Sequence, residues 1–277
     1  MYDKSVEVDQ SIIDKIDSLP PLPKTVIEIE EFRQKKSKEL DDLLDIINKD
    51  ALLVATLLKV SNSAIFCFKS KIETVRKAVN LLGIEFTISI AMSSALQNIL
   101  KTNLFPYGIH SNDFMRASNL SSRLAQLWLK GEVRNELVLP AFLQETGMFI
   151  LAEIIDERGQ TNDFVKALQT GDRTEVELQY TGLTSTKLTS LIFQKWKLCS
   201  YMSHVIACVD DIAHCNVAYL KYTQTLHVLK TICEVTDPLS EENIEKGLIK
   251  ASEFNLDVDA LKKAIVKLQD DLLEEDD

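Results

Sequence analysis

The stretch LDDLLDIINKDALLVATLLKV, residues 40–60, predicts two consecutive amphipathic helices. Apolar side chains recur in it at intervals of three and four residues, which places them on one face of a helix. Asp50 stands between the two halves, where its carboxylate can cap the second helix. The apolar stripe consists of Leu40, Leu43, Leu44, Ile47, Leu53, Leu57 and Val60.

The same periodicity extends along most of the chain. In residues 74–82 it recurs, and Gly83 is placed to end that helix in a left-handed turn. Sustained strand alternation is absent from the sequence, and so are the Asn-Gly and Asp-Gly pairs typical of hairpins. The sequence therefore predicts an all-α fold. Further helices are expected over residues 84–100, 112–129, 136–156, 161–170, 184–196, 202–234, 241–251 and 257–274.

Length and composition restrict the class of protein. The 277 residues are 45% hydrophobic, which suffices for one large domain or two modest ones. The most apolar stretches, such as Val138–Leu143, are shorter than the ~18 residues of a membrane span. The polar N-terminus lacks the apolar run of a secretory signal, and five scattered cysteines suit free thiols in a reducing compartment. We therefore expect a cytoplasmic protein without a membrane span.

The charge is acidic and uneven. The net charge is −11, and residues 240–277 hold twelve acidic and five basic side chains. Nucleic-acid binding needs a concentrated positive field, which neither half of the chain offers. We predict no nucleic-acid partner and interpret the acidic end as a solvated helical face with a frayed tail.

Few residues have the spacing of a catalytic or metal site. In the segment Cys208–Cys215, Asp210 and His214 are i, i+4 neighbours that could share an ion on a helix. A closed site needs about four ligands. We therefore interpret the two as a hydrogen-bonded pair, with the two cysteines packed as small hydrophobes. Glu175 and Glu177 are predicted to lie on an exposed helix surface, because nothing in the local pattern buries either one.

Two segments look like joints. The segment Leu19–Pro23 holds three prolines and must be extended, and Leu19 and Leu22 are predicted to anchor it by packing. The segment Lys101–Ser111 separates a first helical group from a second. At the end of the predicted helix over residues 51–60, the amide of Asn62 is expected to bind orphan carbonyls or to adopt the left-handed cap conformation.

Several motifs, in order, resemble those of the HDOD family, helical output modules of bacterial signalling proteins related to the HD-type metal phosphohydrolases. LPPLP at 19–23 is similar to the family's opening LPxLP, and Ala51 stands where the family usually has proline. The other matching stretches lie at residues 43–64, 72–83, 141–150 and 177–196.

The resemblance implies a two-lobed, all-α HDOD module over residues 12–212. Its first helical lobe would cover about 12–103 and its HD-like lobe about 104–212. Residues 213–277 are then expected to form a C-terminal helical extension with an acidic tail.

The resemblance also locates the positions where the catalytic relatives bind a divalent metal. In this sequence those positions hold Ala117, Gln144, Glu145 and Thr184. Alanine has no ligand atom and a neutral amide does not replace an imidazole. The only carboxylate candidates are Glu145, Asp210 and Asp211, which would favour a weak Mg²⁺ or Ca²⁺ site at best. We predict no catalytic residue, no metal ligand and no cofactor, and expect Glu145 to reach a Lys, Arg or backbone donor or to lie at the surface.

These observations predict a non-enzymatic module of signal transduction that binds one or more signalling proteins and can self-associate. Two alternatives remain at this point. One is a metal-dependent phosphohydrolase with atypical ligands, and the other is a small-molecule sensor that uses the vestigial pocket between helices.

Overall fold

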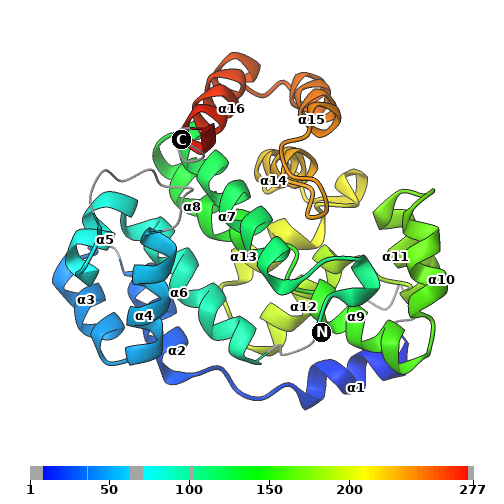
Figure 1. The fold of residues 1–277 in the computed structure, drawn as a ribbon, viewed down its shortest axis with the longest axis horizontal. Coiled ribbons are helices and arrows are strands. Elements are labelled where there is room, and N and C mark those ends of the chain that lie inside the picture. The colour runs from blue at the N-terminus through cyan, green and yellow to red at the C-terminus, as the bar shows by residue number, and fades with distance from the viewer. Residues whose placement is uncertain (1–8, 36, 63–70, 100–102, 274–277) are drawn as a thin grey trace.

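The computed structural model describes residues 9–35, 37–62, 71–99 and 103–273, and these ranges contain helices but no β-strand. The all-α prediction is confirmed (Figure 1). Outside the described residues lie Ser63 and Ala64 of the matching stretch 43–64, Cys67, Lys101 and the tail Glu274–Asp277. The helices are α1 (Gln10–Ser18), α2 (Lys24–Gln34), α3 (Leu40–Asn48), α4 (Ala51–Ser61), α5 (Val75–Leu82), α6 (Ile84–Ile99), η2 (Phe105–Tyr107), α7 (Ser111–Trp128), α8 (Gly131–Leu143), α9 (Met148–Glu157), α10 (Thr161–Leu168), α11 (Arg173–Thr181), α12 (Ser185–Lys195), α13 (Ser200–Ala207), η3 (Ile212–His214), α14 (Leu220–Ile232), α15 (Glu241–Glu253) and α16 (Val258–Leu273).

The helices that decide the fold class form as predicted. Asp50 caps α4 by accepting hydrogen bonds from the backbone N–H groups of Leu52 and Leu53, at 3.1 and 3.0 Å. Gly83 ends α5 with φ 84°, which glycine adopts without a steric penalty. Its ψ of 159° lies outside the left-handed helical region, so the positive φ is confirmed but not the expected turn conformation.

Two helices that the periodicity predicts as continuous are interrupted. The helix expected over 136–156 is broken by the turn at Gln144–Gly147. A Cβ on Gly147 would lie 2.2 Å from the carbonyl oxygen of Ser185, so only glycine allows this approach to α12. The helix expected over 202–234 divides into α13, η3 and α14. Asn216 contributes to this break because its side chain accepts a hydrogen bond from the N–H of Ala218, in competition with the helix.

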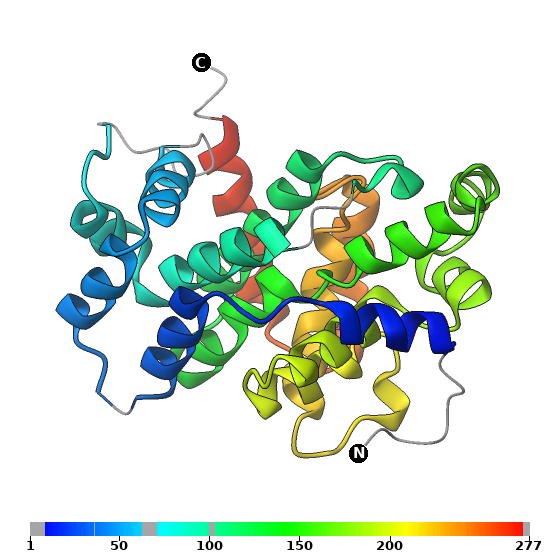
Figure 2. The same cartoon turned by 90° about the horizontal axis from the view of Figure 1, so that it is seen from below.

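The N-terminal segment links the two sides of the molecule. Helix α1 packs against α9 and α12, and the extended residues 19–23 cross the underside to α2 (Figure 2). Leu22 is buried, Leu19 is partly buried against the core, and Trp196 donates a hydrogen bond of 2.9 Å to the carbonyl of Pro20. The prediction of a packed, extended segment is confirmed.

Asn62 acts as a cap through its side chain. Its amide donates to the carbonyl oxygens of Leu58 and Ile72, at 2.7 and 2.8 Å, and accepts from the N–H of Ile72 at 2.8 Å. Its φ of −95° shows that the left-handed alternative is wrong. The amide thereby joins the end of α4 to the segment before α5.

One segment of the chain is longer and more apolar than the sequence analysis predicted. Residues 131–157 are long and apolar enough to cross a membrane by length and composition alone, with a mean hydropathy of 1.5, because α8 and α9 are both apolar. Of the most apolar window, 94% is buried inside the structure. This burial corresponds to the position of a core helix pair.

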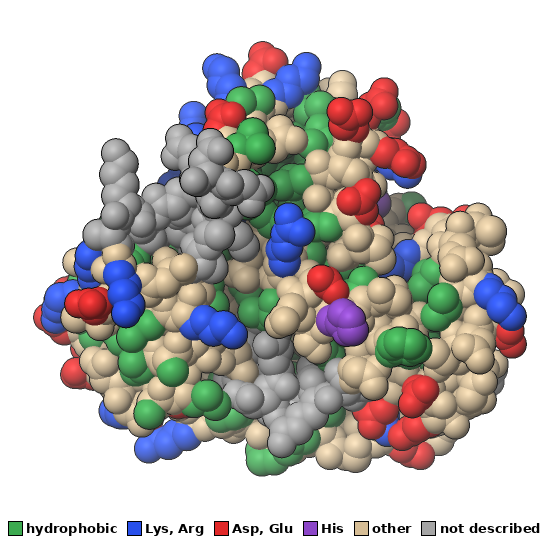
Figure 3. Space-filling model, viewed as in Figure 1, with side chains coloured by type: hydrophobic (Ala, Val, Ile, Leu, Met, Phe, Trp, Pro, Cys, Tyr) green, Lys and Arg blue, Asp and Glu red, His purple; other side chains and the backbone are tan. Residues whose placement is uncertain are grey.

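The last helices cover the second helical group. Helix α14 packs against α7, α8 and α13, α15 packs against α14, and α16 against α7 (Figure 1). Acidic side chains gather on the exposed surface of α15, as expected for a solvated face (Figure 3). Through these contacts α14 lies over the positions matched to the metal site of the catalytic relatives, near Ala117, Gln144 and Glu145.

Candidate functional site

The structure brings most of the positions matched to the HD-type metal site together. Ala117 of α7 and the adjacent residues Gln144 and Glu145 line one small cavity of about 10 Å³. Thr184 caps α12, and its hydroxyl accepts a hydrogen bond from the N–H of Lys187. All four residues are buried. The register of the resemblance is therefore consistent with a single place in the fold.

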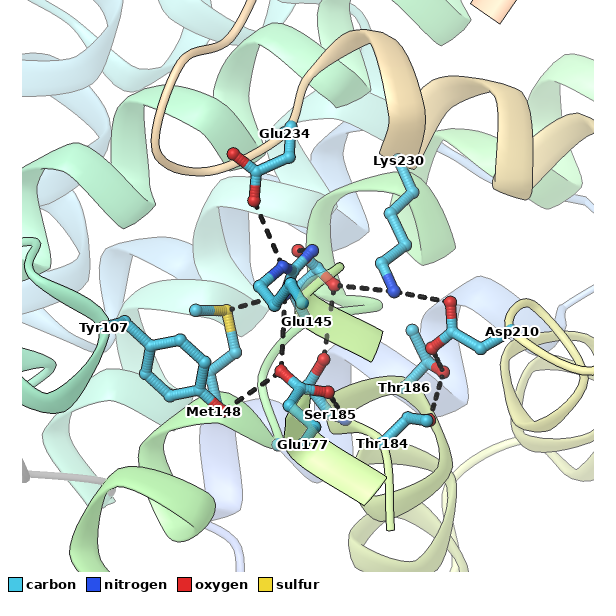
Figure 4. Close-up of polar contacts among 12 residues, drawn as sticks. Tyr107, Glu145, Met148, Glu177, Thr184, Ser185, Thr186, Asp210, Lys230 and Glu234 are labelled. Atoms are coloured by element: carbon cyan, nitrogen blue, oxygen red, sulfur yellow. Dashed lines mark hydrogen bonds and ion pairs between the residues drawn. The ribbon is translucent and has the colours of Figure 1, made fainter. Parts of the chain in front are cut away.

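Lys230 of α14 occupies the space between two of the three carboxylates proposed as weak ligands (Figure 4). Its Nζ lies 2.5 Å from Oδ1 of Asp210 and 3.4 Å from Oε1 of Glu145. The Lys230 side chain is 8% exposed. The buried ammonium group therefore interacts favourably with both carboxylates, and its single positive charge offsets one of their two negative charges.

Arg173 of α11 neutralises the other side of the site. Its guanidinium contacts Glu145 at 2.7 Å, Glu177 at 3.5 Å and Glu234 at 3.1 Å. The expectation that Glu145 reaches a basic side chain is confirmed, because it binds both Arg173 and Lys230. The term ion-pair cluster is used below for Glu145, Arg173, Glu177, Asp210, Lys230 and Glu234.

The prediction for Glu177 is wrong, although Glu175 is exposed as expected. The Glu177 residue is 0% exposed, and its carboxylate accepts hydrogen bonds from the hydroxyl of Tyr107 at 3.0 Å and from the N–H of Ser185 at 2.6 Å. The local pattern did not reveal this burial, because the covering residues come from η2 and α12, distant in sequence. Burial raises the pKa of Glu177 despite the opposing charges of Arg173 and Lys230.

The charges in the ion-pair cluster stabilise one another against the cost of burial. Burial acts to raise the pKa of Asp210, but the charge and hydrogen bond of Lys230, helped by Thr186, lower this pKa to about 2. Burial acts to lower the pKa of Lys230, yet Asp210 and Glu145 raise it above its ordinary value. For Arg173, burial is likewise outweighed by its carboxylate partners, and its pKa is raised. The two basic groups and Asp210 are therefore charged at neutral pH.

Threonine hydroxyls complete the hydrogen bonding around Asp210. Thr186 donates a hydrogen bond of 2.6 Å to Oδ2 of Asp210, and the hydroxyl of Thr184 lies 3.1 Å from that of Thr186. Both oxygens of the Asp210 carboxylate are thus engaged by other side chains.

The proposed pairing of Asp210 with His214 is wrong. Asp210 precedes η3 and turns inward to Lys230, whereas the exposed His214 ring lies 2.7 Å from Asp211. Their helical i, i+4 relation is lost because the helix ends at Ala207. Asp211, the third weak carboxylate candidate, is exposed and lies outside the ion-pair cluster. Cys208 and Cys215 carry free thiols.

The residues at this site do not fit a divalent metal. Ala117 has no ligand atom, and Gln144 offers only a neutral amide in place of an imidazole, although its buried carbonyl oxygen has no hydrogen-bond partner in the described ranges. The carboxylates of Glu145 and Asp210 are oriented toward an ammonium and a guanidinium. Within the described part of the chain, no three His, Cys, Asp or Glu side chains are arranged to hold a metal ion.

Sequence reasoning missed the cations of this site. Arg173 stands four residues before Glu177, a spacing that allows an ion pair on one helix, and this was the available local signal. Lys230 and Glu234 carry no local signal, because they lie beyond residue 212 in the part expected to be an extension. Only the packing of α14 against α7 and α8 brings them to the site.

Comparison with protein families gives one match over most of the chain. A family model described as HDOD domain matches residues 19–212. A relative from Treponema pallidum, named only as an uncharacterized protein, is 28% identical over 99 residues. That alignment covers 36% of this chain and 19% of the relative, so the chain spans about a fifth of the relative's length.

Solved structures share the fold across almost the whole chain. A "Putative phosphohydrolase" from Shewanella amazonensis has a TM-score of 0.69 at 18% identity, covering 96% of each chain. A "Putative signal transduction protein" from Marinobacter aquaeolei has a TM-score of 0.69 at 18% identity, covering 97% of this chain and 61% of the other. An HDOD domain protein with unknown function from Geobacter sulfurreducens has a TM-score of 0.66 at 17% identity, covering 96% and 93%. At these identities the likeness shows the fold alone.

Proposed function

Because this chain belongs to the HDOD family, we propose that it is a non-enzymatic module of signal transduction that acts by binding another protein. The observation that carries the proposal is the ammonium group of Lys230 between Glu145 and Asp210. This tethered cation lies beside the positions that the resemblance matches to the metal ligands of the catalytic relatives.

The physical argument concerns the work needed to replace that cation. A metal ion bound to Glu145 and Asp210 would displace the Lys230 ammonium from these carboxylates. The ammonium would then be a buried charge without a partner, which costs roughly 3–5 kcal/mol. A metal ion that activates water also needs firm ligands and an open coordination position. Ala117 and Gln144 provide no firm ligand, so this donor set does not support metal-dependent hydrolysis.

The cavity beside the matched positions is too small to support the alternative of a small-molecule sensor. The cavity lined by Ala117, Gln144 and Glu145 has a volume of about 10 Å³. A volume of that order holds about one water molecule, whereas ligand pockets are typically ~300–1,000 Å³.

Two measurements test the proposal against the phosphohydrolase alternative. Untagged protein is incubated with Mn²⁺, Fe²⁺ or Zn²⁺, desalted and subjected to elemental analysis, and hydrolysis of bis(p-nitrophenyl) phosphate is assayed in parallel. We expect substoichiometric metal and a rate equal to that of the Glu145→Gln variant. Near-stoichiometric metal together with turnover that a chelator removes and Glu145→Gln abolishes would overturn the proposal.

A positive test concerns the partner. Protein captured from the native cell extract is identified, purified and recombined with this chain, and the affinity of the two pure proteins is measured. A purified partner that binds at micromolar concentration or tighter supports the proposal. Failure of every captured candidate to bind in the purified system contradicts it.

A further inference from the structure

A large open groove lies away from the ion-pair cluster, between the first helical group and the second. Its volume is about 1160 Å³. One wall comes from the end of α2, the segment before α3 and the start of α6, and the other comes from the starts of α8 and α13 together with α14. The residues that matter for its chemistry are three cations, three carboxylates and two tyrosines.

The cations of the first wall are already paired. Arg33 binds Glu30 through two hydrogen bonds of 2.9 and 3.0 Å. Lys35 lies 2.9 Å from Asp42, and Lys38 lies 2.6 Å from Glu85. Each positive charge of this wall therefore has its own carboxylate, and the wall offers little net attraction for an anion.

The carboxylates of the second wall are not paired. Glu132 and Glu136 lie four residues apart at the start of α8, which places them on the same face of the helix. In the described ranges neither one forms an ion pair or a side-chain hydrogen bond. Two like charges at this spacing repel each other. A cation between them would be attracted to both carboxylates and would also relieve their repulsion.

The phenol of Tyr201 provides a third acceptor beside these carboxylates. Its hydroxyl oxygen is buried and has no hydrogen-bond partner in the described part of the chain. Burial, followed by the charges of nearby groups including Glu136 and Glu132, raises the pKa of this phenol. The Tyr201 ring packs edge-on against Tyr222, with ring centroids 5.4 Å apart, and both residues line the groove.

We propose that this groove binds a peptide segment of a partner protein through an arginine side chain placed between Glu132, Glu136 and Tyr201. The inference rests on the proposed function as a protein-binding module and names the chemistry of its partner.

The groove's chemistry selects this occupant over others. A guanidinium presents five N–H donors in one plane, enough for two carboxylates and a phenol oxygen together, and it stacks on aromatic faces. A lysine ammonium has three donors and no plane to stack. The groove is open and has a volume of about 1160 Å³, so it has room for an extended segment around the arginine.

Fluorescence anisotropy tests the proposal with the fluorescein-labelled peptide GSGRLRGSG. The matched peptide carries citrulline, which keeps the shape and loses the charge, at both arginine positions. At about 100 mM salt, which screens distant charges, we expect the arginine peptide to bind at least about tenfold more tightly than the citrulline peptide.

Paired variants separate the groove from the general acidity of the protein. Glu132→Gln with Glu136→Gln should weaken binding about tenfold, whereas Glu241→Gln with Glu245→Gln should change it less than about twofold. The second pair has the same spacing and lies exposed on α15. Tyr201→Phe keeps the ring and should weaken binding several-fold through loss of the acceptor.

Equal losses in the two double variants, or equal affinity for the two peptides, would overturn the proposal. Thermal melting of each variant establishes that it is folded. The metal and hydrolysis measurements use different residues and readouts, so an active enzyme with an arginine-selective groove would refute the proposed function alone.

Discussion

The ion-pair cluster and the groove beside Tyr201 are both polar regions between helices, but they differ in how completely their charges are satisfied. In the cluster, two cations contact four carboxylates, and hydroxyl and backbone groups bind several of the remaining oxygens (Figure 4). In the groove, two carboxylates and a phenol have no partner in the described ranges. The first region is complete by itself, whereas the second would be completed by a cation from outside.

This difference separates structural polarity from polarity available for recognition. Buried charges persist in a folded protein when each one is paired and hydrogen-bonded. Such a cluster connects α8, α11, α12 and α14, and its charged groups are directed at one another. A groove with unpaired groups costs some stability, and that cost is recovered only when a partner binds.

The largest expected effect comes from removing the central cation of the cluster. Lys230→Met leaves Glu145 without one partner and Asp210 without its ion pair, and we expect a loss of about 3–5 kcal/mol in the free energy of unfolding. Urea unfolding at pH 7 measures this loss. Lys221→Met, at an exposed position of the same helix, is the control. Similar losses in both variants would show that the cluster is not a closed ionic unit.

The second prediction concerns pH. The folded-state pKa of Asp210 is depressed to about 2 from 3.8, so its stabilising contribution is present above pH 4 and is lost as pH falls through 2. The full contribution is about 2 kcal/mol, roughly half of which is lost between pH 5 and pH 3. The stability difference between wild type and Asp210→Asn should therefore narrow over this range. The control is Asp211→Asn, at the exposed neighbouring position. If its stability difference from wild type narrowed by the same amount between pH 5 and pH 3, the assignment of the effect to the depressed pKa of Asp210 would be contradicted.

A third prediction concerns an uncharged side chain whose polar groups are all hydrogen-bonded, for comparison with the charged groups of the ion-pair cluster. Asn62→Ala removes three hydrogen bonds between the end of α4 and Ile72, and should cost about 1–2 kcal/mol. Asn48→Ala, at the exposed end of α3, should change stability by less than about 0.5 kcal/mol. Denaturant unfolding of the pair measures the difference. An Asn62→Ala variant as stable as Asn48→Ala would favour a role for Asn62 in recognition.

Removing a tyrosine hydroxyl should change stability with opposite sign in the two regions, and the smallest effect of all is expected in the groove. Tyr107→Phe removes a hydroxyl that donates to Glu177 and should destabilise the protein by about 1–3 kcal/mol. Tyr201→Phe removes a buried hydroxyl without a partner in the described ranges, so stability should stay unchanged or rise by up to about 1 kcal/mol. Melting temperatures of the two variants decide the matter. A clear destabilisation by Tyr201→Phe would mean that its hydroxyl is already satisfied.

Local sequence patterns determined the all-α class and many of the helices. The apolar stripe of residues 40–60, the cap at Asp50 and the extended segment at Leu19–Pro23 are all confirmed, because each depends on residues within a few positions of one another. Patterns of the same kind failed where a helix had to end for a tertiary reason. In the turn that interrupts the helix expected over 136–156, Gly147 lies too close to Ser185 for a Cβ to fit, and no local periodicity records this contact.

Only the tertiary structure decided the character of the candidate site. The sequence identified Glu145 and Asp210 as carboxylate candidates and predicted that Glu145 would reach a basic or backbone donor or lie at the surface. Which groups neutralise them depends on α11 and α14, whose Arg173 and Lys230 are remote in sequence. The burial of Glu177 follows the same rule, since Tyr107 and Ser185 come from other elements. Helix periodicity is a property of near neighbours, whereas the pairing of buried charges is set by which helices pack together, and that packing brings them within a few ångströms.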